Sequence, residues 1–201
     1  MIERKQYLNQ LISKKENGLI KVITGIRRCG KSVLLFELFK DYLISKGIEQ
    51  AQIIEIKLDK IDYIKYRNPF YLYKQIHKTI TLNKYDKYYL FIDEIQMAIK
   101  KKDRQTGVIA TIYDILNGFR DNKLLDVYVT GSNSKMLSTD IATEFRGRSS
   151  RINVHPLSFK EYFEYIGGDE QKALMEYMII GGMPGIIHEE TFVKEEICPA
   201  K

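Results

Sequence analysis

The sequence predicts an α/β protein with a parallel five-stranded sheet sandwiched by helices, followed by the start of a small helical C-terminal segment. Two observations predict this class. Short β-rich apolar stretches alternate with helical patterns through about residue 154, as in parallel strands joined by helical crossovers. The stretch 88–93 (YYLFID) is apolar up to its last residue, which suits a strand covered on both faces.

The first part of the chain alternates twice between helix and strand. Residues 2–15 carry apolar side chains at three- and four-residue spacing and predict a short amphipathic helix. A strand is expected at 19–24. The helix at 32–46 is so densely apolar that it must be largely buried, and Gly47 ends it. Residues 51–58 alternate and predict the second strand.

The alternation continues through the middle of the chain. Asn68 and Pro69 open a helix that runs to about Thr81, as N-cap and first-turn proline. The third strand is expected at 88–93. The charge run in 98–106 predicts a solvated loop. A helix at 108–119 and a fourth strand at 126–130 should follow.

The last part predicts a change from sheet to helices. A helical turn at 134–138 and a fifth strand at 151–154 are followed by a capping box of Ser158 and Glu161, which opens a helix to about Ile166. Further expected elements are a helix at 169–180, a stop at 181–185 (GGMPG) and a short charged tail. We therefore expect a core at 1–157 and a helical segment at 158–201, which would be an incomplete lid or the start of a truncated C-terminal region.

Composition sets broad limits. The 201 residues are 44% hydrophobic and 29% charged, enough to bury a sizeable core. No stretch reaches membrane-spanning length, the N-terminus is charged, and the two cysteines lie far apart, so we expect a cytoplasmic protein without a membrane partner. The net charge of +6 is spread along the chain, which permits contact with nucleic acid without indicating it.

The strongest motif lies between the first strand and the next helix. Residues 25–32 (GIRRCGKS) match G-x-x-x-x-G-K-[ST], a phosphate-binding loop, in the strand–loop–helix context it needs. Gly25 and Gly30 let backbone N–H groups face phosphate oxygens, and the helix N-terminus adds its dipole. Lys31 brings a charge to the β- and γ-phosphates, and the Ser32 hydroxyl can ligate Mg²⁺. The nucleotide-contacting residues are expected to be Gly25, Ile26, Arg27, Arg28, Cys29, Gly30, Lys31, Ser32 and Val33.

Polar side chains end two later strands. Asp93 and Glu94 follow the buried third strand, where one carboxylate can hold Mg²⁺ and the second can accept a proton from the attacking water. After the fourth strand come Ser132 and Asn133. We favour Asn133, and less firmly Ser132, as the polar group that orients the water, although such a sequence is also typical of a plain turn.

Six stretches together resemble one family. TGIRRCGKS, YLFIDEIQ, VYVTGSNSKML, FRGR, HPLSFKEY and GGMPG occur in this order at the spacing of the prokaryotic AAA-type predicted ATPases, an AAA domain followed in full-length members by a domain of unknown function. The resemblance spans nearly all of residues 1–187 and implies a P-loop NTPase fold. It implies that the fourth strand lies between the first and third. It also implies that Lys31 and Ser32 contact phosphate and Mg²⁺, Asp93 holds Mg²⁺, Glu94 is the base and Asn133 the sensor.

The resemblance further implies that Arg148 is an arginine finger, with Arg146 as the alternative; that role would require a homo-oligomer. A surface charge near a turn is the other interpretation. Family members continue well beyond 181–185, so we expect the chain to be a fragment or a truncated gene product.

The leading functional hypothesis is an ATP hydrolase whose turnover drives a conformational change; the alternative is a nucleotide-dependent signalling switch with slow hydrolysis. Glu94 beside Asp93 argues against a kinase, in which water must be excluded. A GTPase is disfavoured because residues 122–125 (NKLL) lack the acidic residue expected for guanine. A pure nucleic-acid-binding module would need a concentrated basic face or a reading helix, and the sequence predicts neither.

Overall fold

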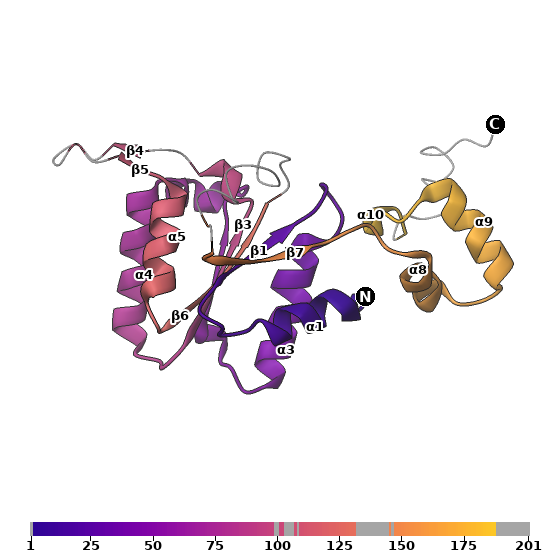
Figure 1. Cartoon of the computed structure of the whole chain (residues 1–201), viewed down its shortest axis with the longest axis horizontal. Coiled ribbons are helices and arrows are strands. Elements are labelled where there is room, and N and C mark those ends of the chain that lie inside the picture. The colour runs from indigo at the N-terminus through magenta and orange to yellow at the C-terminus, as the bar shows by residue number, and fades with distance from the viewer. Residues whose placement is uncertain are drawn as a thin grey trace.

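The structure is a computed structural model that describes residues 2–98, 101–102, 107, 109–131, 145 and 147–187. Within this part, five strands form one sheet in the order β2-β3-β6-β1-β7, and every pairing in it is parallel (Figure 1). The strands are β1 (Ile20–Thr24), β2 (Ile53–Lys57), β3 (Tyr88–Asp93), β6 (Leu125–Thr130) and β7 (Ser149–Asn153). The predicted parallel five-stranded sheet is confirmed.

The strand order brings the predicted motifs to one edge. β6 pairs with β1 on one side and β3 on the other, which confirms the predicted position of the fourth strand. Parallel strands end at the same edge of a sheet, where ligands of α/β proteins bind. The residues at the carboxyl ends of β1, β3 and β6 therefore meet there.

Helices cover both faces of the sheet, as Figure 1 shows. On one face lie α4 (Pro69–Asn83) and α5 (Ile112–Asp121), whose buried Leu72 and Leu116 belong to one core cluster. On the other lie α1 (Lys5–Ser13) and the helix after the loop, which together bury a second cluster that includes Leu11 and Phe39. This second face also carries Asp93.

The predicted helix at 32–46 is one helical segment with three parts. These are α2 (Lys31–Val33), a π-helical stretch η1 (Leu34–Phe39) and α3 (Lys40–Ser45). The buried residues of η1 are Leu34, Leu35, Phe36 and Phe39, so the dense apolar pattern corresponds to real burial. Gly47 follows with a φ of 87°, as expected for a helix end.

The helix predicted at 108–119 begins later than expected. Thr111 is its N-cap and forms a capping box with Asp114, so α5 starts at Ile112. The preceding residues form β5 (Ile109–Ala110), which pairs antiparallel with β4 (Lys101–Lys102). The predicted solvated loop is wrong at this pair of lysines, although both remain exposed.

Several other boundaries differ slightly from prediction. α1 is shorter at both ends, α4 extends two residues further, and β7 begins two residues earlier. Short 3₁₀ turns are η2 (Gln50–Gln52), which shortens the second predicted strand, η3 (Ile61–Arg67) and η4 (Ile95–Met97). A short helix, α10 (Pro184–Ile187), begins within the stop predicted at 181–185. The turn predicted at 134–138 lies outside the described residues.

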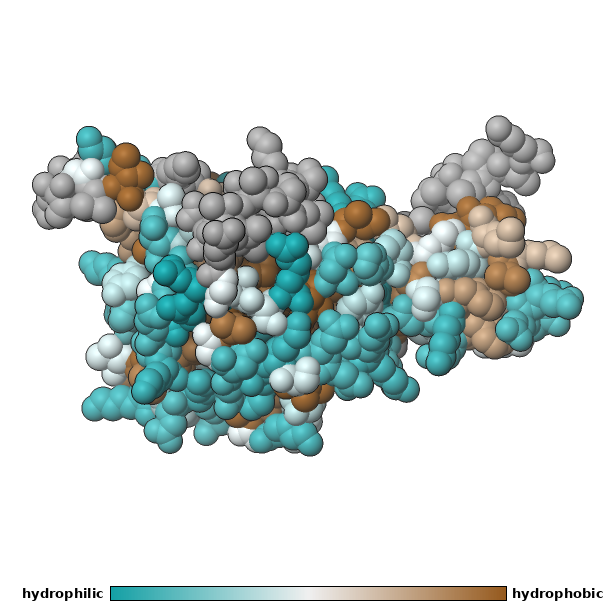
Figure 2. Space-filling view, in the orientation of Figure 1, coloured by the Kyte–Doolittle hydropathy of each residue, from teal (hydrophilic) through white to brown (hydrophobic). Residues whose placement is uncertain are grey.

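The last helices form a small separate cluster beyond β7 (Figure 1). α8 (Phe159–Ile166) opens with the predicted capping box, in which the Ser158 amide donates to Glu161 Oε2 at 2.9 Å. α9 (Glu170–Ile180) packs against it around Leu157, Tyr162 and Ala173. Figure 2 shows hydrophobic atoms exposed over α9, where the exposed apolar residues are Leu174, Met175, Met178 and Ile179. The predicted boundary between 157 and 158 stays a prediction.

Across the described ranges, every helix falls short of the length and apolar character that a membrane span requires.

Candidate nucleotide-binding site

The loop after β1 has a backbone that depends on glycine at both ends. Gly25 has a φ of 148°, and a Cβ there would lie 2.1 Å from the carbonyl oxygen of Val154, just after β7. Gly30 has a φ of 93° and immediately precedes α2. A side chain at the first position would collide with backbone, and both positions favour glycine through their φ angles. The loop residues thus fold back tightly against the sheet edge.

Lys31 is the buried charge of the loop. It is 4% exposed, and its Nζ donates to the carbonyls of Gly25 at 3.0 Å and Ile26 at 2.8 Å. The ammonium group is therefore held within the loop by the first two loop residues, in the region where backbone amides can gather around an anion.

The remaining loop residues divide into one buried filler and an exposed group. Cys29 is fully buried, its Sγ lies 3.4 Å from the Val154 carbonyl oxygen, and burial raises the pKa of its thiol. Ile26, Arg27 and Arg28 are exposed. Arg28 has a φ of 66° and lines the cavity described below.

The two predicted Mg²⁺ ligands are in direct contact. Ser32 Oγ donates to Asp93 Oδ2 at 2.8 Å, and Asp93 is 5% exposed. A hydroxyl and a carboxylate oxygen are ligands that Mg²⁺ accepts. In the part of the chain that the structure describes, no three His, Cys, Asp or Glu residues cluster for a metal. The pair therefore fits Mg²⁺ that takes its other ligands from phosphate and water.

Thr130, the last residue of β6, joins this pair and was missed by sequence reasoning. Its Oγ1 donates to Oδ1 of Asp93 and accepts the backbone N–H of Glu94 at 3.2 Å. The hydroxyl is fully buried. Asp93 is thus held by Ser32 on one oxygen and by Thr130 on the other. Thr130 is the polar last residue of an apolar strand, and that position is the signal in the sequence that could have identified it.

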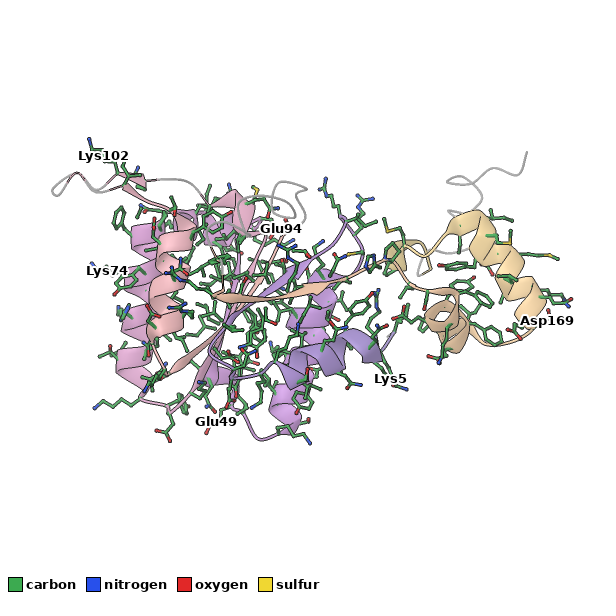
Figure 3. The ribbon with its side chains drawn as sticks, viewed as in Figure 1. Lys5, Glu49, Lys74, Glu94, Lys102 and Asp169 are labelled. Carbon is green, nitrogen blue, oxygen red and sulfur yellow. The ribbon has the colours of Figure 1, made fainter. Side chains whose placement is uncertain are left out.

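Glu94 lies at the turn after β3, where Figure 3 labels it. Its φ of 52° and ψ of 53° are left-handed, a conformation that costs a non-glycine residue energy and is common at functional sites. Gln96 Nε2 donates to Oε2 of Glu94. Sequence reasoning also missed this glutamine, although it stands within the quoted stretch YLFIDEIQ.

A cavity of about 330 Å³ is lined by several of these groups. Its polar wall includes Arg28, Lys31, Ser32 and Glu94, and its apolar wall includes Ile2, Val33, Leu157 and Pro184. The volume is within the range of small-molecule pockets. Residues from the N-terminal segment, the loop, the turn after β3 and the C-terminal helical part therefore share one site.

Among the predicted residues that the structure describes, Arg148 lies apart from this site. Asn133, like Ser132, lies outside the described residues, and so does Arg146. Arg148 is exposed and immediately precedes β7, where its carbonyl accepts the Ile20 amide at 3.0 Å. That is the amino end of β1, whereas the loop follows its carboxyl end. The five residues of β1 span roughly 16 Å, so Arg148 is not brought together with Lys31 or Glu94 within one chain.

The sheet order and the G-x-x-x-x-G-K-S loop after β1 define a P-loop NTPase fold of the AAA type. The chain belongs to the AAA domain family, which matches residues 17–163.

Relatives share this sequence over part of their length. An uncharacterized protein of Haemophilus influenzae is 35% identical over 204 residues, covering 98% of this chain and 47% of the relative. An uncharacterized protein of Methanocaldococcus jannaschii is 31% identical over 194 residues, covering 88% and 38%. The chain therefore spans less than half the length of these relatives.

Two solved structures share the fold. The structure of C. elegans PCH-2 superposes with a TM-score of 0.54 at 15% identity, covering 97% of this chain and 50% of that one. A DNA replication initiation factor gives 0.51 at 16% identity, covering 95% and 57%. At such identities the likeness concerns the fold alone.

Proposed function

We propose that the protein binds ATP with Mg²⁺ and hydrolyses its β–γ phosphoanhydride bond. The observation that carries the proposal is the direct contact between Ser32 and Asp93, because Ser32 lines a cavity together with Lys31 and Glu94. These residues come from two elements far apart in the sequence and supply the charge, metal ligands and base that phosphoryl transfer to water requires.

Each residue has a distinct part in this proposal. Lys31 and the loop amides bind phosphate oxygens, and Ser32 and Asp93 would hold Mg²⁺, which neutralises charge on the transferred phosphoryl group when bound. Glu94 accepts the proton of the attacking water. Thr130 fixes Asp93 and the start of the Glu94 turn, and Asn133 is the proposed sensor.

The base of the nucleotide would occupy the apolar side of the cavity. Ile2, Val33, Leu157 and Pro184 offer surfaces against which a planar base can pack. We propose adenine because the lysine at 123 is not followed by the acidic residue that would accept hydrogen bonds from guanine.

A slow signalling switch is the second candidate, and a specific contact favours it. Gln96 donates to the Glu94 carboxylate, which is the proposed base. A carboxylate engaged in this way has a competing hydrogen bond when water binds. In that case bound nucleotide would set the conformation and hydrolysis would be slow.

The wider role is also a proposal. Turnover would drive a conformational change in the C-terminal helices, in a further region such as the relatives possess, or in a partner. Homo-oligomers are proposed because Arg148 lies too far from its own chain's site and could serve a neighbour's. The net charge of +6 permits nucleic acid as an effector.

The test is ATP turnover with Mg²⁺, measured with and without DNA and at several protein concentrations. We expect turnover that disappears in Lys31→Ala and on chelation of the metal. Tight ATP binding with almost no turnover under every condition would favour the switch. Absence of both binding and turnover would contradict the proposal.

A further inference from the structure

Arg4 is a buried arginine that contacts three parts of the fold. It is 5% exposed, and its Nη1 donates to the Cys29 carbonyl in the phosphate loop at 3.2 Å. Its Nη2 donates to the His155 carbonyl beyond β7 at 2.6 Å. Its Nε lies 3.1 Å from Oε1 of Glu161, in the first turn of α8. One guanidinium thus joins the loop to the C-terminal helices.

The surroundings of Arg4 hold it in place. Its φ of 46° is left-handed, and its guanidinium lies 4.7 Å from the centre of the Tyr7 ring. The Tyr7 hydroxyl accepts the His155 amide at 3.2 Å. Left-handed backbone at a non-glycine residue is costly and persists only where the surrounding structure imposes it.

The helix that follows Arg4 is fixed to the sheet at its other end. Leu11 is fully buried in the core cluster of that face. Just after α1, the Glu16 amide donates to Asp126 Oδ2 at 2.8 Å, and Asp126 pairs with the buried Lys21 of β1. Arg4 therefore precedes a helix, α1, that is attached to β1 and β6 of the sheet.

Arg4 also lines two cavities. It lines the nucleotide cavity together with Lys31, and it lines a second cavity of about 630 Å³ between the N-terminal segment and α8. Glu161 lines only the second of these. A movement of the Cys29 carbonyl would shift the Arg4 guanidinium and thereby its contact with Glu161, which does not line the nucleotide cavity.

We propose that Arg4 is a positioning residue that couples the phosphate loop to α8 and α9. Nucleotide binding moves or stiffens the loop at Cys29, and the guanidinium passes this change to Glu161 and the first turn of α8. The inference rests on the proposed function and adds to it the route by which nucleotide reaches the C-terminal helices.

The experiment measures amide hydrogen exchange of α8 and α9 with and without ATP and Mg²⁺, in parallel with ATP affinity. In the wild type we expect added protection of these helices when nucleotide binds. Arg4→Met and Glu161→Gln should lose that added protection. Glu161→Gln should also weaken ATP binding by about 5-fold or more, the lower end of typical coupling between sites, and by much less when Arg4→Met is already present.

The matched control is Ser158→Ala. It removes the hydroxyl that caps α8 and that donates to Glu161 Oε2 at 3.0 Å. The Ser158 amide still donates to Oε2, and Arg4 still contacts Oε1, so the variant should loosen α8 and keep the response to nucleotide. Glutamine at 161 can still accept the Ser158 amide, so Glu161→Gln tests the coupling even if Arg4→Met does not fold.

Two results with the variants would overturn the inference. One is a nucleotide response that persists in Glu161→Gln; the other is an equal loss of response in Ser158→Ala. A wild type that binds ATP without any change in α8 and α9 would also overturn it while leaving the proposed ATPase intact. A wild type that fails to bind ATP would instead contradict the proposed function.

Discussion

Ser32 Oγ donates a hydrogen bond of 2.8 Å to Oδ2 of Asp93, across 61 positions of sequence. The contact exists because β1 and β3 flank β6 in a parallel sheet and therefore end at the same edge. It joins the phosphate loop to the carboxylate that follows a buried strand.

Lys31→Ala should abolish nucleotide binding. Among the described residues that line the cavity, Lys31 is the only lysine, and the substitution removes its ammonium group. The guanidinium groups of Arg4 and Arg28 remain. The loss should be about 2–4 kcal/mol if one charge-assisted phosphate contact disappears. Titration with a fluorescent ATP analogue measures it, with Lys46→Ala as an exposed-lysine control. Unchanged affinity would show that phosphate binds elsewhere.

Thr130→Val should raise the Mg²⁺ concentration needed for half-maximal turnover. It leaves Asp93 Oδ1 and the Glu94 amide without the Thr130 hydroxyl, and partners of metal ligands typically affect metal affinity by about 10–100-fold. Thr130→Ser retains the hydroxyl and should stay close to the wild type. If turnover depended on Mg²⁺ concentration in the same way in the valine and serine variants, the Thr130 hydroxyl would have no part in the metal site.

Arg148→Ala should bind ATP but hydrolyse it poorly if its guanidinium reaches a neighbouring subunit. An arginine supplied across an interface can contribute about 10³–10⁵ in rate. The wild type should then show activity per subunit that rises steeply with protein concentration.

The control for Arg148 is a mixing experiment. Arg148→Ala combined with Glu94→Gln should regain activity, because the first subunit supplies an intact base and its neighbour supplies the arginine. Lack of rescue together with flat concentration dependence would leave Arg148 as a surface charge or a contact within one chain.

Stability should fall as the pH rises from 10 towards 12, in part because of Tyr89. Burial, and then the hydrogen bond to Glu16 at 2.5 Å, raise the pKa of this phenol from 10.0 to about 12. The folded protein keeps the proton that the unfolded chain loses, so this contribution is complete below pH 10 and is lost above it. Urea unfolding at several pH values should show a flatter decline for Tyr89→Phe. Parallel curves for the two proteins would contradict the assignment.

The sequence predicted the sheet and the loop well because both have strong local signals. Apolar strands such as 88–93 and the glycine–lysine–serine pattern at 30–32 are readable without knowledge of long-range contacts. The predicted start of α5 at residue 108 was wrong because it followed the helical spacing of apolar residues and did not use the capping box of Thr111 and Asp114.

The missed residues act through contacts that sequence spacing does not record. In the helix predicted at 2–15, Arg4 has the three- and four-residue spacing of Tyr7, Leu8 and Leu11, and a charge among these apolar residues was the available signal. Its partners at 29, 155 and 161 become neighbours only after the chain has folded. Thr130 was overlooked for the same reason, since Asp93 lies on another strand.

The most direct test compares ATP binding and Mg²⁺-dependent hydrolysis by Glu94→Gln and the wild type. The amide has nearly the same shape as the carboxylate but cannot take a proton from water at neutral pH. We predict retained ATP binding and a fall in turnover of about 10²–10⁴-fold, the usual contribution of a general base. Wild-type turnover in Glu94→Gln would contradict the assignment of Glu94 as the base of an ATPase.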